Sequence, residues 1–188
     1  MKKILISGML LCSYFGIAQE ACELMQNESK NCKIVNVEDV RCIAENSENE
    51  NTIFFTFGLW CSPCRLHLKD AIALKENYDV HLIILLSEKE DDELITRTID
   101  YLHKQDESLE IMMMKDTYGK RQGQKYKNFL KEITPEGTKS ILGMSKYIVL
   151  DKKGKVQKIT TWKDNKDNDW QDNSKVLEEH VIPLLKAK

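Results

Sequence analysis

The sequence has 188 residues, the length of one domain or of a domain with an extension, which excludes a large multidomain protein. Its 28 Lys and Arg residues nearly balance its 30 Asp and Glu residues, and the formal net charge at pH 7 is −2. Because no basic field and no cluster of aromatic and basic residues is present, we expect no nucleic-acid partner.

The first eighteen residues have the pattern of a secretory signal peptide. Lys2 and Lys3 give a positive start, residues 4–18 are largely apolar, and Gly16 and Ala18 are small residues of the kind a signal peptidase reads. A helix of this length would span roughly 22 Å, less than the hydrocarbon core of about 30 Å, which disfavours a membrane anchor. We therefore expect cleavage after Ala18, export with the periplasm as the location, and a mature chain that is not embedded in a membrane.

Residues 19–51 are polar and suggest an irregular N-terminal extension with weak helical spacing near its end. The extension carries Cys22, Cys32 and Cys42, so five cysteines follow the leader and at least one lacks a partner within the chain. We predict a Cys22–Cys32 disulfide, although spacing alone does not determine connectivity. Cys42 lies on a weak apolar stripe and is predicted to be a small buried hydrophobe.

From residue 52 onwards, apolar runs alternate between strand and helix patterns. The run at 52–57 is rich in β-branched and aromatic residues, and the almost unbroken apolar run at 80–86 suits a strand covered on both faces. The expected elements are a strand at 52–57, a helix with Pro63 in its first turn that runs towards Asn77, a strand at 80–86, a helix at 87–104, a strand at 109–114, a helix at 121–133, a hairpin of 147–150 with 155–161, and a helix at 174–184.

This order of elements predicts an α/β fold with a central mixed β-sheet flanked by helices on both faces. The three adjacent methionines at 112–114 could suggest a metal ligand set. Since consecutive strand residues face opposite sides and methionine often fills gaps in cores, we predict that they pack in the core.

The segment Trp60-Cys61-Ser62-Pro63-Cys64 carries the chemistry of the chain. At the start of a helix, a cysteine sulfur faces unsatisfied backbone N–H groups and the positive end of the helix dipole, which stabilise its thiolate. Cys61 is therefore the candidate nucleophile, and Cys64, one turn later, is the candidate resolving thiol. Half of a zinc site is disfavoured because no second cysteine pair or His-x₃₋₅-His tract follows. A purely structural role for a Cys61–Cys64 disulfide is also disfavoured, because so short a loop constrains few unfolded conformations.

Two segments resemble the thioredoxin superfamily, and specifically the exported TlpA/ResA-like thiol–disulfide oxidoreductases. They are Phe57-Gly-Leu-Trp-Cys-Ser-Pro-Cys64 after a strand, and Leu142-Gly-Met-Ser-Lys-Tyr-Ile-Val-Leu-Asp-Lys-Lys-Gly154. The resemblance implies a thioredoxin fold, with a thioredoxin-like domain over residues 52–188, and a dithiol active site that has Trp60 and Pro63 in its surround. It also implies protein disulfide or dithiol substrates, electrons from a membrane redox protein, and no cofactor.

Two of the departures from the family pattern concern the expected active site. Ser145 falls where the superfamily carries a cis-proline, and because a cis bond before another residue costs about 2.5–4 kcal/mol, we predict a trans or strained Met144–Ser145 bond. His67 replaces a glutamate that is thought to assist proton transfer in close relatives. It could act as the general base for Cys64, or it could be an exposed helix histidine.

These observations predict an exported thiol–disulfide oxidoreductase that uses Cys61 and Cys64. A reductase of protein disulfides is favoured over an oxidase, because Ser62-Pro63 lacks the histidine between the cysteines that would favour a strongly oxidising site. The alternatives are a non-catalytic thioredoxin-like binding module with an altered Ser145 loop, and a metal-handling protein that uses the Cys61/Cys64 pair.

Overall fold

The computed structural model describes residues 22–28, 30–165 and 169–188. The predicted signal peptide at residues 1–18 lies outside these ranges. Within them, no helix combines the length and the apolar character needed to cross a membrane.

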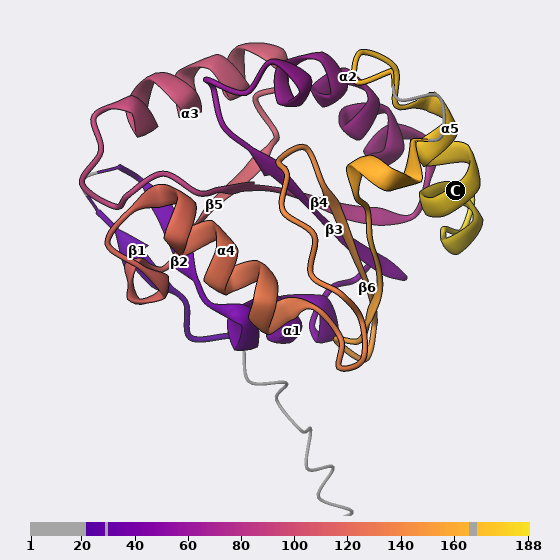
Figure 1. The fold of residues 1–188 in the computed structure, drawn as a ribbon, viewed down its shortest axis with the longest axis horizontal. Helices are drawn as coiled ribbons and strands as arrows, with labels where there is room; N and C mark the ends of the chain where they lie inside the picture. The colour runs from indigo at the N-terminus through magenta and orange to yellow at the C-terminus, as the bar shows by residue number, and fades with distance from the viewer. Residues whose placement is uncertain (1–21, 29, 166–168) are drawn as a thin grey trace, which may run out of the picture.

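A seven-stranded mixed sheet forms the centre of the molecule (Figure 1). The strands follow the order β1-β2-β5-β4-β3-β6-β7, in which β2, β5, β4 and β3 run parallel and β1, β6 and β7 are antiparallel to their neighbours. The strands are β1 Met25–Asn27, β2 Cys32–Val35, β3 Asn51–Phe57, β4 Val80–Leu86, β5 Glu110–Met114, β6 Tyr147–Asp151 and β7 Val156–Ile159, and the α-helices are α1 Val37–Glu45, α2 Ser62–Asn77, α3 Leu94–Gln105, α4 Gln122–Ile133 and α5 Ser174–Val176.

Helices cover both faces of the sheet, and each face has its own apolar core (Figure 1). All seven residues of β3 are buried, as expected of a central strand. Its odd-numbered residues Ile53, Phe55 and Phe57 pack with α2 and α3, whereas Phe54 packs with α1 and α4 on the opposite face. Met113 joins the first core, and Met112 and Met114 join the second, which confirms that the methionines are core residues.

Residues 22–45 are more regular than the sequence suggests. β1 and β2 pair with each other, and β2 lies parallel to β5 at an edge of the same sheet. Asn36 begins α1 with a reciprocal capping box, in which its side chain accepts from the Asp39 N–H while the Asp39 carboxylate accepts from the Asn36 N–H. β2 has only four residues, too few to show a strand pattern in the sequence, and pairing with β5 decides its structure.

The predicted Cys22–Cys32 disulfide is wrong. Cys22 bonds to Cys42, with their Cα atoms 5.9 Å apart, so Cys42 is also not the unpaired buried residue that its apolar stripe suggested. Cys32 is the free buried thiol of the described residues, and its sulfur donates to the Ile111 carbonyl oxygen at 3.3 Å. Since strand residues alternate between faces, β2 directs Cys32 into the core and away from Cys22.

The remaining elements follow the predicted order, with one helix start displaced. α3 begins at Leu94, seven residues after the predicted start at Ser87, because residues 87–93 form a loop after β4. The hairpin of β6 and β7 turns through Gly154, whose φ of +64° favours glycine. The C-terminal helical segment begins with α5 and continues in irregular helical turns to Leu184, near Pro183.

Candidate active site

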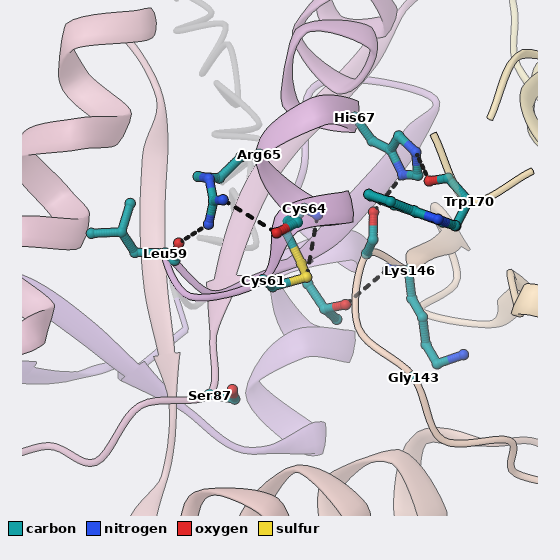
Figure 2. Close-up of a disulfide and its surroundings, with 12 residues drawn as sticks. Leu59, Cys61, Cys64, Arg65, His67, Ser87, Gly143, Lys146 and Trp170 are labelled. Carbon is teal, nitrogen blue, oxygen red and sulfur yellow. Dashed lines mark hydrogen bonds between the residues drawn. A yellow bond between two sulfur atoms is a disulfide. The ribbon is translucent and has the colours of Figure 1, made fainter. Parts of the chain in front are cut away.

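Cys61 and Cys64 lie at the start of α2, where the chain leaves β3 (Figure 2). Cys61 is the N-cap residue, and its sulfur accepts a hydrogen bond from the Cys64 backbone N–H at 3.2 Å. The two sulfurs form a disulfide with the Cα atoms 5.2 Å apart. Pro63 occupies the first turn, where its missing N–H leaves no helix bond unmade. The predicted local structure around both cysteines is therefore confirmed.

The turn that presents the disulfide is tightly held. The Cys61 N–H donates to the Gly58 carbonyl oxygen at 2.9 Å, and Arg65 donates to Leu59 O and Ser62 Oγ (Figure 2). A Cβ on Gly58 would lie 2.8 Å from Nε1 of Trp60, so any other residue at position 58 would displace the indole. With 52% of its surface exposed, Trp60 forms an apolar projection beside the cysteines.

The two sulfurs differ in access. Cys61 retains 6% of its surface exposed, whereas Cys64 is fully buried beneath the first turn of α2. An incoming sulfur would therefore meet Cys61 before Cys64. This difference in access favours Cys61 as the attacking thiol and Cys64 as the resolving thiol, and the assignment stays a prediction.

Ser145 occupies a left-handed backbone position, and no peptide bond within the described ranges is cis. Its φ is +62°, an uncommon value for a residue with a Cβ. The Ser145 N–H donates to Thr56 O at 3.2 Å and the Lys146 N–H donates to Thr56 Oγ1 at 2.9 Å, which fixes this loop to the end of β3. The predicted trans Met144–Ser145 bond is confirmed, and the loop is strained at Ser145 instead.

His67 joins α2 to two distant segments of the chain. Its Nδ1 lies 2.7 Å from Ser145 Oγ, and its Nε2 lies 3.1 Å from the carbonyl oxygen of Trp170 (Figure 2). Because a carbonyl only accepts, Nε2 carries the proton of the neutral ring, and the Ser145 hydroxyl donates to Nδ1. Only 7% of the His67 surface is exposed, so the exposed-histidine alternative is wrong.

Burial favours the neutral form of His67. It lowers the pKa of His67, outweighing the opposing influence of Asp70, the backbone carbonyls of Trp170 and Gln171, and Asp172. Sequence reasoning selected His67 and Ser145 separately, and the structure places the two side chains in contact with each other.

A pocket of about 150 Å³ opens beside this contact. Its lining includes Pro63, His67 and Ser145, which the sequence singles out, together with residues that no motif marks. These further residues are Gly143, Met144, Lys146, Tyr147, Thr160, Thr161, Trp162, Asn165, Trp170, Asn173 and Val176. Trp162 and Trp170 could have been suspected as isolated aromatics in a charged stretch, but no sequence signal distinguishes Lys146 from the other lysines.

The described ranges contain no group of three or more His, Cys, Asp or Glu side chains that could hold a metal ion. Cys61 and Cys64 can supply two soft ligands, whereas protein sites for zinc usually provide three or four. Thiol–disulfide exchange uses these two sulfurs without further ligands.

Comparison with known proteins gives a family match over most of the chain. A family model described as Redoxin matches residues 39–177, a range that includes both cysteines and the Ser145 loop. No curated protein matches the chain significantly. Among solved structures, the chain is similar to the solution structure of a "putative thiol-disulfide oxidoreductase" from Bacteroides vulgatus, with 20% identity, coverage of 73% of this chain and 76% of that chain, and a TM-score of 0.43.

Proposed function

The chain belongs to the Redoxin family of the thioredoxin superfamily and is a thioredoxin-like oxidoreductase, and on that premise we propose that it reduces protein disulfides outside the cytoplasm. The observation that carries this proposal is the position of Cys61 Sγ at the N-cap of α2, where it accepts the Cys64 N–H. The same N–H and the positive helix end would stabilise a Cys61 thiolate in the reduced protein.

The proposed reaction exchanges one disulfide for another. The Cys61 thiolate attacks a substrate disulfide, that S–S bond breaks, and the departing substrate thiolate takes up a proton. Cys64 then loses its proton and attacks Cys61 Sγ, which releases the second substrate sulfur as a thiol and closes the Cys61–Cys64 bridge. The substrate gains two electrons and two protons, and an external dithiol must return them to the enzyme. From the family resemblance, we propose a membrane redox protein as that donor.

Export is supported by two observations. The first eighteen residues have the signal-peptide pattern, and the Cys22–Cys42 disulfide is of a kind that persists in oxidising compartments such as the periplasm. The intact mass of the mature protein tests this part of the proposal. Retention of the leader would contradict it.

His67 is the proposed proton acceptor for Cys64 during the second step. It follows Cys64 by three residues on α2, and its lowered pKa provides the neutral ring that a base requires. In the disulfide form, both ring nitrogens are engaged by Ser145 Oγ and Trp170 O, so accepting a proton requires the Ser145 bond to exchange. A His67→Ala variant with an unchanged pH profile for resolution of the mixed disulfide would remove this role.

Insulin reduction with a dithiol donor tests the activity. The wild-type protein should accelerate the reaction, Cys61→Ser should lose the acceleration, and Cys32→Ala, which removes a buried thiol elsewhere, should retain it. A reduction potential of the Cys61–Cys64 pair near about −120 mV, typical of a strong oxidant, would reverse the proposed direction. Equal activity of wild type and Cys61→Ser would reject the function.

A further inference from the structure

The pocket beside Ser145 has the size of a single apolar side chain. Its volume is about 150 Å³, comparable to an apolar protein cavity that accepts benzene. Pro63, which stands between the two cysteines, belongs to its lining. A group bound there would lie next to the disulfide without occupying the position of either sulfur.

Two tryptophans form an apolar mouth for this pocket. Trp162 is 61% exposed and Trp170 is 52% exposed, although both belong to the lining. Leu142, which precedes the lining residue Gly143, is 51% exposed. Large apolar side chains gathered around a concavity are typical of a binding surface, because leaving them in water is unfavourable.

The wall of the pocket contains a buried amine that has no acidic partner among the described residues. Lys146 retains 2% exposure, and its Nζ donates to the Thr160 carbonyl oxygen at 2.9 Å. Across the described ranges, no carboxylate lies within 4.0 Å of this nitrogen. An ammonium has three N–H donors, and acceptors in the described part of the chain use one of them, which leaves two for a ligand.

Lys125 is also buried, but it has a carboxylate partner. Lys125 Nζ lies 2.6 Å from Asp116 Oδ1 and also donates to Glu88 O. Asp164, the acidic residue whose charge acts on Lys146, is already bound by Lys158 at 2.8 Å. Burial lowers the pKa of Lys146 to about 8, which reflects the cost of an ammonium without a close counter-charge.

We propose that this pocket is a specificity site for protein substrates, which takes a large apolar side chain near the substrate cysteine and pairs a neighbouring Asp or Glu carboxylate with Lys146. The apolar side chain would fill the pocket between the tryptophans, and the carboxylate would supply the charge that Lys146 lacks. The proposal rests on the reductase function and adds to it the class of substrate sequence.

Peptide disulfides test the site directly. The substrates are short peptides that each contain one cysteine and are dimerised through its disulfide. The dipeptide Phe-Glu, Phe-Gln or Gly-Glu is placed one, two or three residues before or after the cysteine. The kcat/KM for reduction of each peptide is measured with the same dithiol donor. At the spacing that fits, Phe-Glu should exceed Phe-Gln by at least about tenfold, which corresponds to about 1.4 kcal/mol. The net negative charge of the protein would by itself favour the uncharged Phe-Gln peptide over the Phe-Glu peptide.

Variants of the protein test whether the pocket causes the preference for the Phe-Glu peptide. Lys146→Met should bring the Phe-Glu to Phe-Gln ratio close to one, whereas Lys153→Met, which removes an equal charge from the exposed hairpin turn, should keep the wild-type ratio. Trp162→Ala, at an exposed position, should reduce the preference for Phe-Glu over Gly-Glu.

The wild-type measurements alone can overturn the proposal, whether or not Lys146→Met folds. Reduction of all peptides with equal efficiency for Glu and Gln at every spacing would reject the specificity site and leave the reductase function intact. Failure to reduce insulin and every peptide would reject the function and the site together.

Discussion

The two disulfides in the described part of the chain involve different helix ends, the start of α2 and the end of α1. Cys61 begins α2, where the helix dipole is positive, whereas Cys42 lies in the last turn of α1, where it is negative. A thiolate is stabilised at the first position and disfavoured at the second. The comparison teaches that the place of a cysteine on its helix, in addition to its pairing, separates an exchangeable disulfide from a structural one.

The two disulfides also close loops of different length. Cys22 and Cys42 are 20 residues apart, and Cys61 and Cys64 are three apart. In the chain-entropy description, the longer loop contributes about 3 kcal/mol to stability and the shorter one about 2 kcal/mol. The Cys22–Cys42 bond thus does more to hold the start of the described chain against α1, and the Cys61–Cys64 bond is the one suited to opening during turnover.

The largest expected effect comes from removing the resolving thiol. Cys64→Ser should reduce multiple-turnover insulin reduction by at least about a thousandfold, because the mixed disulfide on Cys61 can no longer be released internally. Non-reducing electrophoresis and intact mass should show the trapped adduct. If Cys64→Ser reduced insulin as fast as wild type, the assignment of the Cys61–Cys64 bond as the exchangeable disulfide would be wrong.

Alkylation of the fully reduced protein sharpens the comparison further. At pH 7.5, iodoacetamide should modify Cys61 at least about a thousandfold faster than Cys32, since the thiolate is the reacting species. Burial raises the pKa of Cys32 to about 12 and shields its sulfur. A time course read by peptide mass spectrometry gives the rates, and in denaturant they should converge. Similar rates in the folded protein would contradict the poised thiolate.

Removing the Cys22–Cys42 disulfide should lower the stability of the protein without changing its reductase activity. Cys22→Ala combined with Cys42→Ala should lower the free energy of unfolding by about 3 kcal/mol and leave kcat/KM for insulin within about twofold of wild type. Urea unfolding under non-reducing conditions measures the loss. The matched variant Cys61→Ala with Cys64→Ala opens the shorter loop and should lose less stability while losing all activity.

The smallest effect expected is a pH dependence at His67, which follows Cys64 by three residues on α2. Burial lowers the folded-state pKa of His67, so the unfolded state binds its proton first as the pH falls. The stability linked to this group is complete above about pH 6.5, the ordinary pKa of histidine, and is lost as the pH falls towards the folded-state pKa. Between pH 7.5 and pH 5, wild type should lose more unfolding free energy than His67→Gln. An equal loss would contradict this prediction.

Local patterns made much of the active site predictable. The strand at 52–57, the following turn and the helix with Pro63 in its first turn are specified by neighbouring residues, and β3 and α2 match them closely. The start of α3 was less predictable, because the acidic stretch after Ser87 resembles a helix N-terminus but lies in a loop whose Glu88 is buried. Burial of a polar residue depends on what surrounds it in space, which periodicity does not report.

The sequence by itself determined the cysteine pair at a helix start, the apolar strands and the departure from proline at Ser145, since these depend on residue type and spacing along the chain. The tertiary structure alone decided that Cys22 pairs with Cys42, that His67 bonds to Ser145 Oγ, and that Lys146 is buried beside two tryptophans. Those contacts join residues 20, 78 and up to 24 positions apart, and only the packing of strands and helices brings such residues together.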